Sequence, residues 1–263
     1  MTSTLQPSII VYDQAQEEFG KWTFDAPTLT KNGGGRTVYI HSHSSSPHKK
    51  TSGSHHPRIQ LCKDDDPRLI CPFGLGNFQD SKSCPSSTGG RMTLDMSVTH
   101  TPLIEFFKAL DSLIINVACR ECNEWFSKNL TRQQITSMYR PCLTQKSDNY
   151  PAAIRTKLTL KGGEGGGGRP VSIWKVIEES GGNITYTPGS AKDITRGSEI
   201  WACVDVTSMY FMSTLFGCTL TVSDLLVYPP RQSFPFLTTM KSVMMIEQQH
   251  DRRDDEFDDD ILN

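Results

Sequence analysis

The sequence has a low fraction of apolar residues and no long hydrophobic run. Of its 263 residues, 36 % are hydrophobic, and the mean hydropathy is −0.40. No stretch approaches the roughly 18 unbroken apolar residues of a membrane-spanning helix. Residues 1–7 also lack the basic and apolar regions of a secretory signal. We therefore expect no membrane association, an intracellular location, and eight reduced cysteines, since disulfides persist mainly in oxidising compartments.

Recognisable catalytic and metal-binding motifs are missing as well. The glycine run at 162–168 lacks the Gly-Lys-Ser/Thr ending of a phosphate-binding loop, and we expect a hairpin loop between two strands there. Cys119-x-x-Cys122 falls inside a predicted helix and has no second pair, which favours buried thiols over a zinc site. With no nucleophile elbow and no His-Glu-x-x-His, the sequence predicts a protein that is not an enzyme and holds no cofactor or metal.

The net charge of −2 conceals an asymmetry along the chain. Residues 251–263 hold seven of the 29 acidic side chains and two of the 27 basic ones, which leaves 22 acids and 25 bases in residues 1–250. The body is therefore basic by about three charges, and the C-terminal segment is acidic by about five. A basic body with an acidic tail is typical of proteins that bind an anionic partner.

Hydrophobic periodicity predicts a mainly β protein with a helical insertion. Alternation at period two over 92–98 and from 153 onward indicates half-buried strands. Apolar residues at helical spacing predict a helix over 102–126, and Thr131-x-x-Gln134 predicts a capping box that begins a second helix ending near Tyr139. Further strands are expected at 171–177, 184–187, 199–206, 209–212, 218–222 and 225–228. This order of elements predicts one antiparallel β domain with an inserted helical hairpin.

Composition predicts four segments along the chain. Residues 1–58 hold short strands and a low-complexity Ser/His loop at 41–57, which we expect to be disordered. Residues 59–230 form the main domain, and 231–250 form a linker. The last segment, 251–263, is an acidic tail that we also expect to be disordered.

The acidic tail combines charge with apolar anchors. One interpretation is a solubilising tail, but a solubiliser needs no apolar side chains. A docking peptide does, because charge steers it to a basic groove and an apolar side chain fills a pocket. The tail also resembles a nucleic-acid mimic that competes for the body's own basic surface. The candidate partner-docking residues are Asp254, Asp255, Glu256, Phe257, Asp258, Asp259, Asp260, Ile261 and Leu262.

Basic and aromatic side chains gather around the glycine run. Arg155, Lys157 and Lys161 share one side of a predicted strand, because strand side chains alternate. Trp174 and Lys175 follow the glycines, and Trp201, Tyr210 and Phe211 are further candidates for base stacking. An ordinary solvated face and buried core aromatics are the alternative interpretations. A basic groove with aromatic platforms is the arrangement that binds single-stranded nucleic acid without sequence preference.

Several segments, in order, resemble a single-stranded DNA-binding protein family of nucleocytoplasmic large DNA viruses. That family is related to the single-stranded DNA-binding proteins of lytic-phage replication systems. The resemblance covers about residues 59–228, and the acidic tail agrees with it. The matching segments are 71–78, 106–115, 124–126, 139–141, 150–158, 209–211 and 216–219.

The resemblance implies an OB-like β-barrel that binds single-stranded DNA in replication and recombination. It implies a basic strand at Arg155 and Lys157 and an aromatic strand at Tyr210 and Phe211. It also implies that the acidic tail engages a polymerase, primase or helicase, in the nucleus or a viral replication factory. Two departures weaken DNA binding: Thr214-Leu215 stands where the family has Gly-Lys, and Leu220 where it has an aromatic residue. The loop at 41–57 has the character of a lineage-specific insertion. The chain could therefore come from a virus or from a cell that carries a virus-derived copy.

Two hypotheses follow. The first is a sequence-tolerant single-stranded DNA-binding protein, with homo-oligomers left open. The second is a non-enzymatic structural or adaptor protein, such as a virion or replication-factory scaffold. The position of Arg155, Lys157 and Trp174 separates them: a shared face favours DNA binding, whereas dispersal or burial favours an adaptor.

Overall fold

The computed structural model describes residues 9–30, 35–42, 55–77, 91–147, 149–160, 169–178 and 184–228. These residues all belong to one unit, which spans Met1–Pro230. The predicted linker at 231–250 and the predicted tail at 251–263 lie outside them. Among the described residues, no helix has the length and apolar character that crossing a membrane requires.

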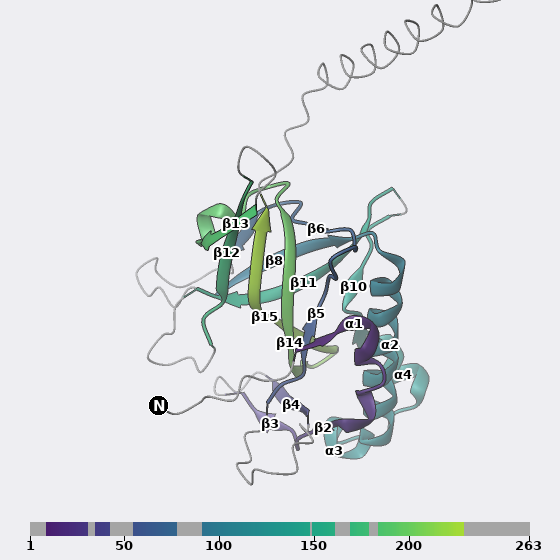
Figure 1. Ribbon diagram of the computed structural model, residues 1–263. Coiled ribbons are helices and arrows are strands. Elements are labelled where there is room, and N and C mark those ends of the chain that lie inside the picture. The colour runs from purple at the N-terminus through teal and green to yellow at the C-terminus, as the bar shows by residue number, and fades with distance from the viewer. Residues whose placement is uncertain are drawn as a thin grey trace, which may run out of the picture. The chain divides into compact units, whose positions relative to one another are not determined.

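Strands dominate the described residues, as the periodicity predicts (Figure 1). The N-terminal strands are β1 (Ile9–Val11), β2 (Trp22–Phe24), β3 (Thr28–Leu29), β4 (Arg36–Ser42), β5 (Arg58–Gln60), β6 (Leu69–Ile70), β7 (Leu75–Asn77) and β8 (Arg91–Val98). After the helices come β9 (Tyr139–Arg140), β10 (Leu143–Thr144), β11 (Ala152–Thr159), β12 (Ser172–Glu178), β13 (Ile184–Pro188), β14 (Glu199–Phe211) and β15 (Phe216–Tyr228).

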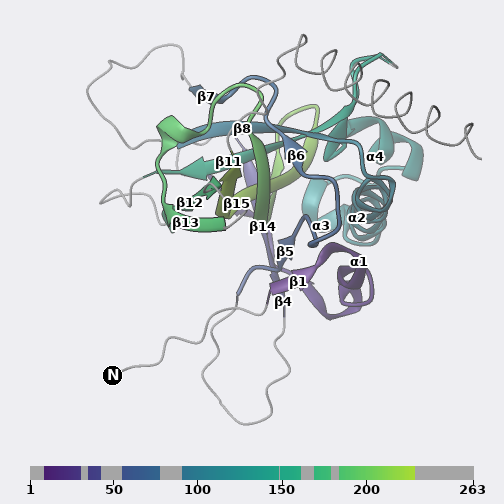
Figure 2. The same cartoon turned by 45° about the horizontal axis from the view of Figure 1, so that its top comes forward.

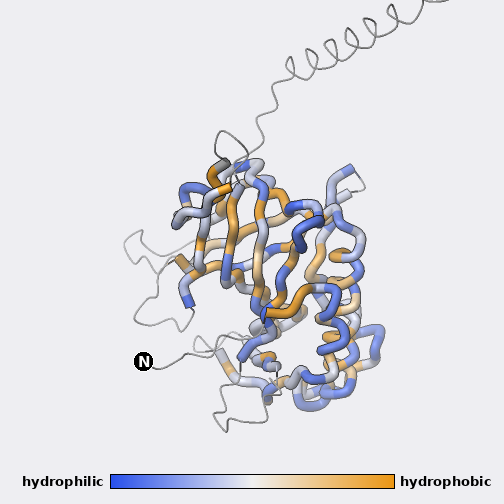
Figure 3. The backbone as a smooth tube through the Cα atoms, in the orientation of Figure 1, coloured by the Kyte–Doolittle hydropathy of each residue, from blue (hydrophilic) through white to orange (hydrophobic). Residues whose placement is uncertain are grey.

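Five strands pair in a closed circuit. β14 pairs with β6, β6 with β8, β8 with β11, β11 with β15, and β15 returns to β14. The side chains on one side of these strands are buried apolar residues, which form the centre of the core. They include Leu69, Leu94, Met96, Ile154, Leu158, Val204, Val206, Val222 and Leu225. Figure 3 shows the hydrophobic residues running along these strands.

The sheet is mixed, which corrects the expectation of an antiparallel β domain. β11 and β12 both run parallel to β15 along the same edge. The backbone N–H of Val171 donates to the carbonyl of Thr159 at 2.8 Å. The chain therefore resumes its direction after the glycine-containing segment, and β11 and β12 are not the two arms of a hairpin. The glycine run itself, at 162–168, lies outside the described residues.

The three larger helical segments α2, α3 and α4 lie between β8 and β9 in the chain, and all the α-helices group on one side of the strands in both views (Figures 1 and 2). They are α1 (Tyr12–Ala15), α2 (Thr101–Arg120), α3 (Cys122–Phe126) and α4 (Arg132–Met138), with 3₁₀ turns at Phe19–Lys21 and Ala191–Asp193; α1 alone comes from the N-terminal segment. The predicted helix over 102–126 breaks at Glu121, whose backbone leaves the helical region. The predicted capping box is confirmed, because Gln134 N–H donates to Thr131 Oγ1 at 3.3 Å and Thr131 N–H donates to Gln134 Oε1 at 2.8 Å.

The predicted boundary between residues 58 and 59 falls inside a paired strand. β5 contains both residues and pairs with β14, and β4 pairs with the far end of β14. The apolar residues Tyr12, Trp22 and Val38 are buried in the same core as the circuit. The described N-terminal strands therefore pair with the strands of the predicted main domain and share its core.

Candidate functional site

The exposed side of the sheet around β15 holds four of the eight predicted nucleic-acid-binding residues, Arg155, Lys157, Trp174 and Trp201. We call this the outer face: the side of β11, β12, β14 and β15 opposite the buried apolar residues. On β15 it carries Thr221, Asp224 and Leu226, which are partly exposed, and Tyr228, which is buried. β14 lies along one edge of β15, and β11 and β12 lie along the other.

A row of large side chains crosses three adjacent strands on this face. Leu226 on β15 pairs with Trp174 on β12 and with Trp201 on β14. Trp174 is 44 % exposed, and its indole N–H donates to Ser172 Oγ at 3.1 Å. Trp201 is partly buried, and its indole N–H has no partner. Two tryptophans that the sequence places 27 residues apart therefore flank one leucine.

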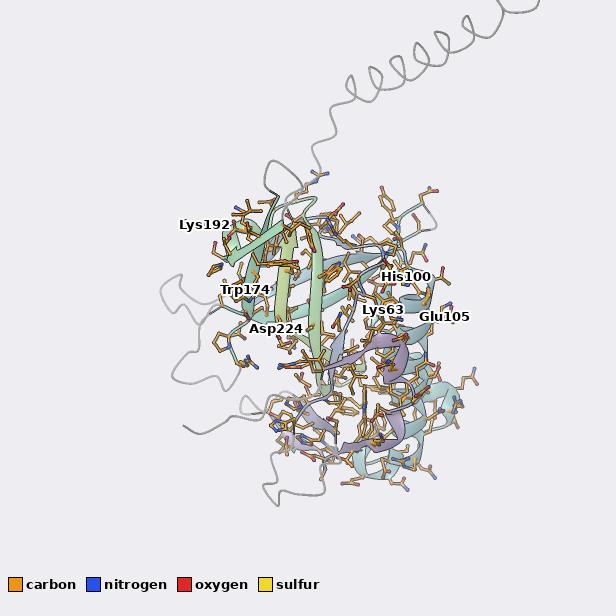
Figure 4. All side chains as sticks on the ribbon, in the orientation of Figure 1. Lys63, His100, Glu105, Trp174, Lys192 and Asp224 are labelled. Carbon is orange, nitrogen blue, oxygen red and sulfur yellow. The ribbon has the colours of Figure 1, made fainter. Side chains whose placement is uncertain are left out.

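Two tyrosines extend the row, and the sequence analysis missed both. Tyr186 on β13 pairs with Val176, two residues from Trp174 on the same side of β12, and is 57 % exposed. The ring of Tyr228 lies 6.3 Å from that of Trp201, and Tyr228 is itself buried, so it supports the row. In the strand predicted at 184–187, Ile184 and Tyr186 are two residues apart and therefore lie on the same side. This spacing is the sequence signal that could have placed Tyr186 on one face. Together, the four rings form an aromatic platform: Trp174, Tyr186, Trp201 and Tyr228. Figure 4 labels Trp174 and, on the neighbouring strand, Asp224.

Arg155 and Lys157 lie on the outer face along β11, and both are exposed. Lys157 pairs with Thr221, so Arg155, Lys157 and Trp174 follow one edge of β15 on the same face. Arg155 is held by a carboxylate across the strand pair. Its Nε donates to Asp95 Oδ1 at 2.7 Å and its Nη2 donates to Asp95 Oδ2 at 2.8 Å. This pairing raises the pKa of Arg155 above its ordinary value.

The middle of the face holds a buried arginine. Arg58 on β5 is 7 % exposed and donates to both carboxylate oxygens of Asp205, at 2.7 and 3.0 Å. Its Nη1 also lies 3.8 Å from Asp224 Oδ2. The hydrogen bonds that Arg58 donates to Asp205 raise the pKa of Arg58, against the opposing effect of burial. This arginine is part of the structure of the sheet and is not accessible to a ligand.

A third arginine, Arg68, lies at the end of the face where β15 finishes, beside Tyr228. The guanidinium of Arg68 lies 3.5 Å from the centre of the Tyr228 ring, and its Nη1 donates to Glu199 at 2.9 Å. Burial raises the pKa of Tyr228, and the charge of Arg68 partly opposes that shift. The described part of the outer face, together with the residues of β5, β8 and the segment before β6 that contact it, thus includes four cations and four carboxylates. They are Arg58, Arg68, Arg155 and Lys157, with Asp95, Glu199, Asp205 and Asp224.

The basic track predicted from the sequence is only partly present. Lys175 points to the opposite side of β12 from Trp174, because adjacent strand residues alternate, and its Nζ lies 3.0 Å from Asp193 Oδ1. That contact and the bonds from Ser190 lower the pKa of Asp193. The prediction that Lys175 joins Trp174 on one surface is therefore wrong. Lys161 lies outside the described residues.

The two aromatic residues near the end of β14 are largely structural. Phe211 is buried, and its ring stacks on that of Phe216 at 5.5 Å, so the prediction that it stacks on a base is wrong. A register shift near Thr207 changes which side of β14 faces the core, and Phe211 turns inward as a result. Tyr210 is half-buried over Gly217, where a Cβ atom would lie 2.7 Å from the Tyr210 hydroxyl.

Of the two cysteines of the motif, Cys119 is partly buried and Cys122 bonds to backbone. Cys122 is buried, and its sulfur accepts the N–H of Leu130 at 3.1 Å and donates to the carbonyl of Lys128 at 3.1 Å. Within the described ranges, His, Cys, Asp and Glu side chains nowhere gather in a group of three or more that would hold a metal ion. The candidate docking residues of the acidic tail, 254–262, lie outside those ranges.

A comparison with protein-family models finds no match to the chain, and a comparison with curated protein sequences finds no significant relative.

Proposed function

We propose that this protein binds single-stranded DNA, with little sequence preference, through the aromatic platform of its outer face. The observation that carries the proposal is the row of Trp174, Leu226 and Trp201 across three adjacent strands, with Trp174 open to solvent. The closed circuit of five strands supports it, because OB-type barrels have five strands and bind oligonucleotides on a strand face. The family resemblance of residues 59–228 points the same way.

Stacking supplies most of the binding in this proposal. A base stacked on an aromatic side chain contributes about 1–3 kcal/mol, whatever the base. Trp174 and Tyr186 are the most exposed rings of the platform and receive the first bases. Lys157 and Arg155 lie farther along the same edge of β15, where the sugar-phosphate backbone of the bound DNA strand would continue. The role assigned to the protein is that of a non-enzymatic DNA-binding factor in replication or recombination.

The acidic tail completes the proposal. We place its function in docking a polymerase, primase or helicase and in competing with DNA for the body of the protein. The combination of charge with Phe257, Ile261 and Leu262 supports this role. The proposed setting is the nucleus or a viral replication factory, in a virus or in a cell with a virus-derived copy.

Fluorescence anisotropy with a labelled oligo-dT and its duplex, at low and physiological salt, tests the proposal. Trp174→Ala should weaken single-strand binding about 5- to 150-fold, which corresponds to about 1–3 kcal/mol of stacking. The control is Tyr150→Ala, which removes an exposed ring from the turn before β11. A chain truncated after residue 250 should bind more tightly if the tail competes. Equal binding by the two alanine variants, or no single-strand binding at all, would refute the proposal.

One observation favours the adaptor function instead. Arg58, Arg68 and Arg155 each pair with a carboxylate, so the described surface is not a strongly basic track. A charge-balanced face with exposed aromatics also suits a protein partner. Failure of every chain to bind oligo-dT at low salt would favour this function.

A further inference from the structure

The ion pair between Arg155 and Asp95 lies at the surface of the proposed DNA-binding face. The two residues are directly opposite each other in the antiparallel pairing of β11 with β8. Two N–H groups of the guanidinium donate to the two carboxylate oxygens, at 2.7 and 2.8 Å. The Arg155 side chain is 72 % exposed, whereas that of Asp95 is mostly covered. The carboxylate is therefore fixed in the sheet, and the guanidinium faces solvent.

Arg155 differs in this respect from the two other arginines of the outer face. Arg58 is buried between two carboxylates, and Arg68 is covered on one side by the ring of Tyr228. Arg58 presents no donor group to solution, and Arg68 is only 29 % exposed with one nitrogen bonded to Glu199. Arg155 has the exposure that phosphate binding needs, but its two parallel donors are already occupied.

A guanidinium binds carboxylates and phosphates with the same two parallel donors. We propose that Asp95 occupies the position of a DNA phosphate on Arg155 and so withholds this arginine from single-stranded DNA. Asp95 is then a specificity-determining residue, because it shifts binding from phosphate contacts toward base stacking. The inference rests on the proposed function, since it assigns a role to one pair at the edge of the same face.

Removing the charge of Asp95 should free Arg155 for one additional phosphate. In single strands, each neutralised phosphate steepens the dependence of log affinity on log salt concentration by about 0.7. Asp95→Asn should therefore steepen that slope by about 0.7. Between 50 and 200 mM salt, the affinity of Asp95→Asn should therefore fall about 2.6-fold more than the affinity of the unmodified chain. At low salt the variant should bind more tightly than the unmodified chain.

The test is a salt titration of oligo-dT binding by the full chain and by Asp95→Asn, Arg155→Ala and the double variant. Arg155→Ala alone should change the slope little, because Asp95 already holds the arginine. In the double variant the gain of Asp95→Asn should disappear. Glu124→Gln makes the same charge change at an exposed position of α3 and serves as the control. Thermal unfolding of each variant checks that it folds.

The outcomes separate this inference from the proposed function. A steeper slope and tighter binding in Asp95→Asn, lost on Arg155→Ala, support it. The inference is wrong if Asp95→Asn matches Glu124→Gln, or if its gain survives in the double variant, while Trp174→Ala still weakens binding. In that case the proposed function stands. Absence of single-strand binding by every chain, at low salt, overturns both.

Discussion

Replacing Tyr139 by phenylalanine removes one hydroxyl from a buried carboxylate site that joins α2 to the sheet. Tyr139 Oη donates to Asp111 Oδ1 at 2.6 Å, and the N–H of Cys142 donates to the same oxygen at 3.0 Å. Tyr139 is buried at the start of β9, which pairs with β15. Burial raises the pKa of Asp111 above its ordinary value, and the bonds from Tyr139 and Cys142 act against that shift. Burial likewise raises the pKa of Tyr139, so its hydroxyl stays a donor at neutral pH.

The cost of Tyr139→Phe should depend on pH. A hydrogen bond to a charged group contributes about 1.5–3 kcal/mol to the free energy of unfolding, and a neutral one about 0.5–1.5 kcal/mol. Asp111 binds its proton more tightly in the folded state, so its titration lowers stability as pH rises through the window between the two pKa values. Loss of the Tyr139 bond raises the folded-state pKa further. The destabilisation is therefore largest at neutral pH and shrinks as Asp111 becomes protonated.

Urea unfolding of the unmodified chain and of Tyr139→Phe, at about pH 7.5 and again at progressively lower pH, measures this difference. We expect a loss of about 1.5–3 kcal/mol at the higher pH and a smaller loss in acid. Tyr150→Phe removes an exposed hydroxyl and should change neither value. The same loss at every pH, or a loss that grows in acid, would contradict the assignment of an ionised Asp111 as the acceptor.

Three further substitutions test the fold by urea unfolding. Thr131→Ala removes the side chain that caps α4 and should cost about 1 kcal/mol. Gly35→Ala should cost about 1–3 kcal/mol, because its Cβ would lie 2.7 Å from the backbone oxygen of Phe211, whereas Gly20→Ala meets nothing within 4 Å and serves as its control. Arg58→Met leaves two carboxylates without their buried cation and should cost about 3–5 kcal/mol; a cost below 1 kcal/mol would show that the pair contributes little.

Much of the secondary structure follows from local pattern. The capping box at Thr131 and the alternation in β11 both predict what the structure contains, because each depends on residues a few positions apart. The predicted breaks within β14 and β15 are wrong for an identifiable reason. The register shifts near Thr207 and Ser223 move the buried side of each strand by one residue. In a continuous strand with such a shift, the alternation of apolar and polar residues changes phase at the shift, so the sequence looks like two separate strands.

The candidate site is less predictable, because its properties depend on pairing between distant segments. Alternation within β11 places Arg155 and Lys157 on one side, and the structure agrees. Nothing near Arg155 in the sequence identifies Asp95 as its partner, because the two residues are 60 positions apart and meet only through the register of β11 with β8.

The charge of the outer face is therefore a product of the fold. A count of basic residues predicts a phosphate track, whereas the cross-strand carboxylates leave a nearly neutral surface on which the aromatic side chains are the most available contacts. For a ligand with both phosphates and bases, such a surface favours the bases, since the energy of stacking does not require an unpaired cation. The dependence of binding on salt should consequently be shallower than the number of lysines and arginines suggests.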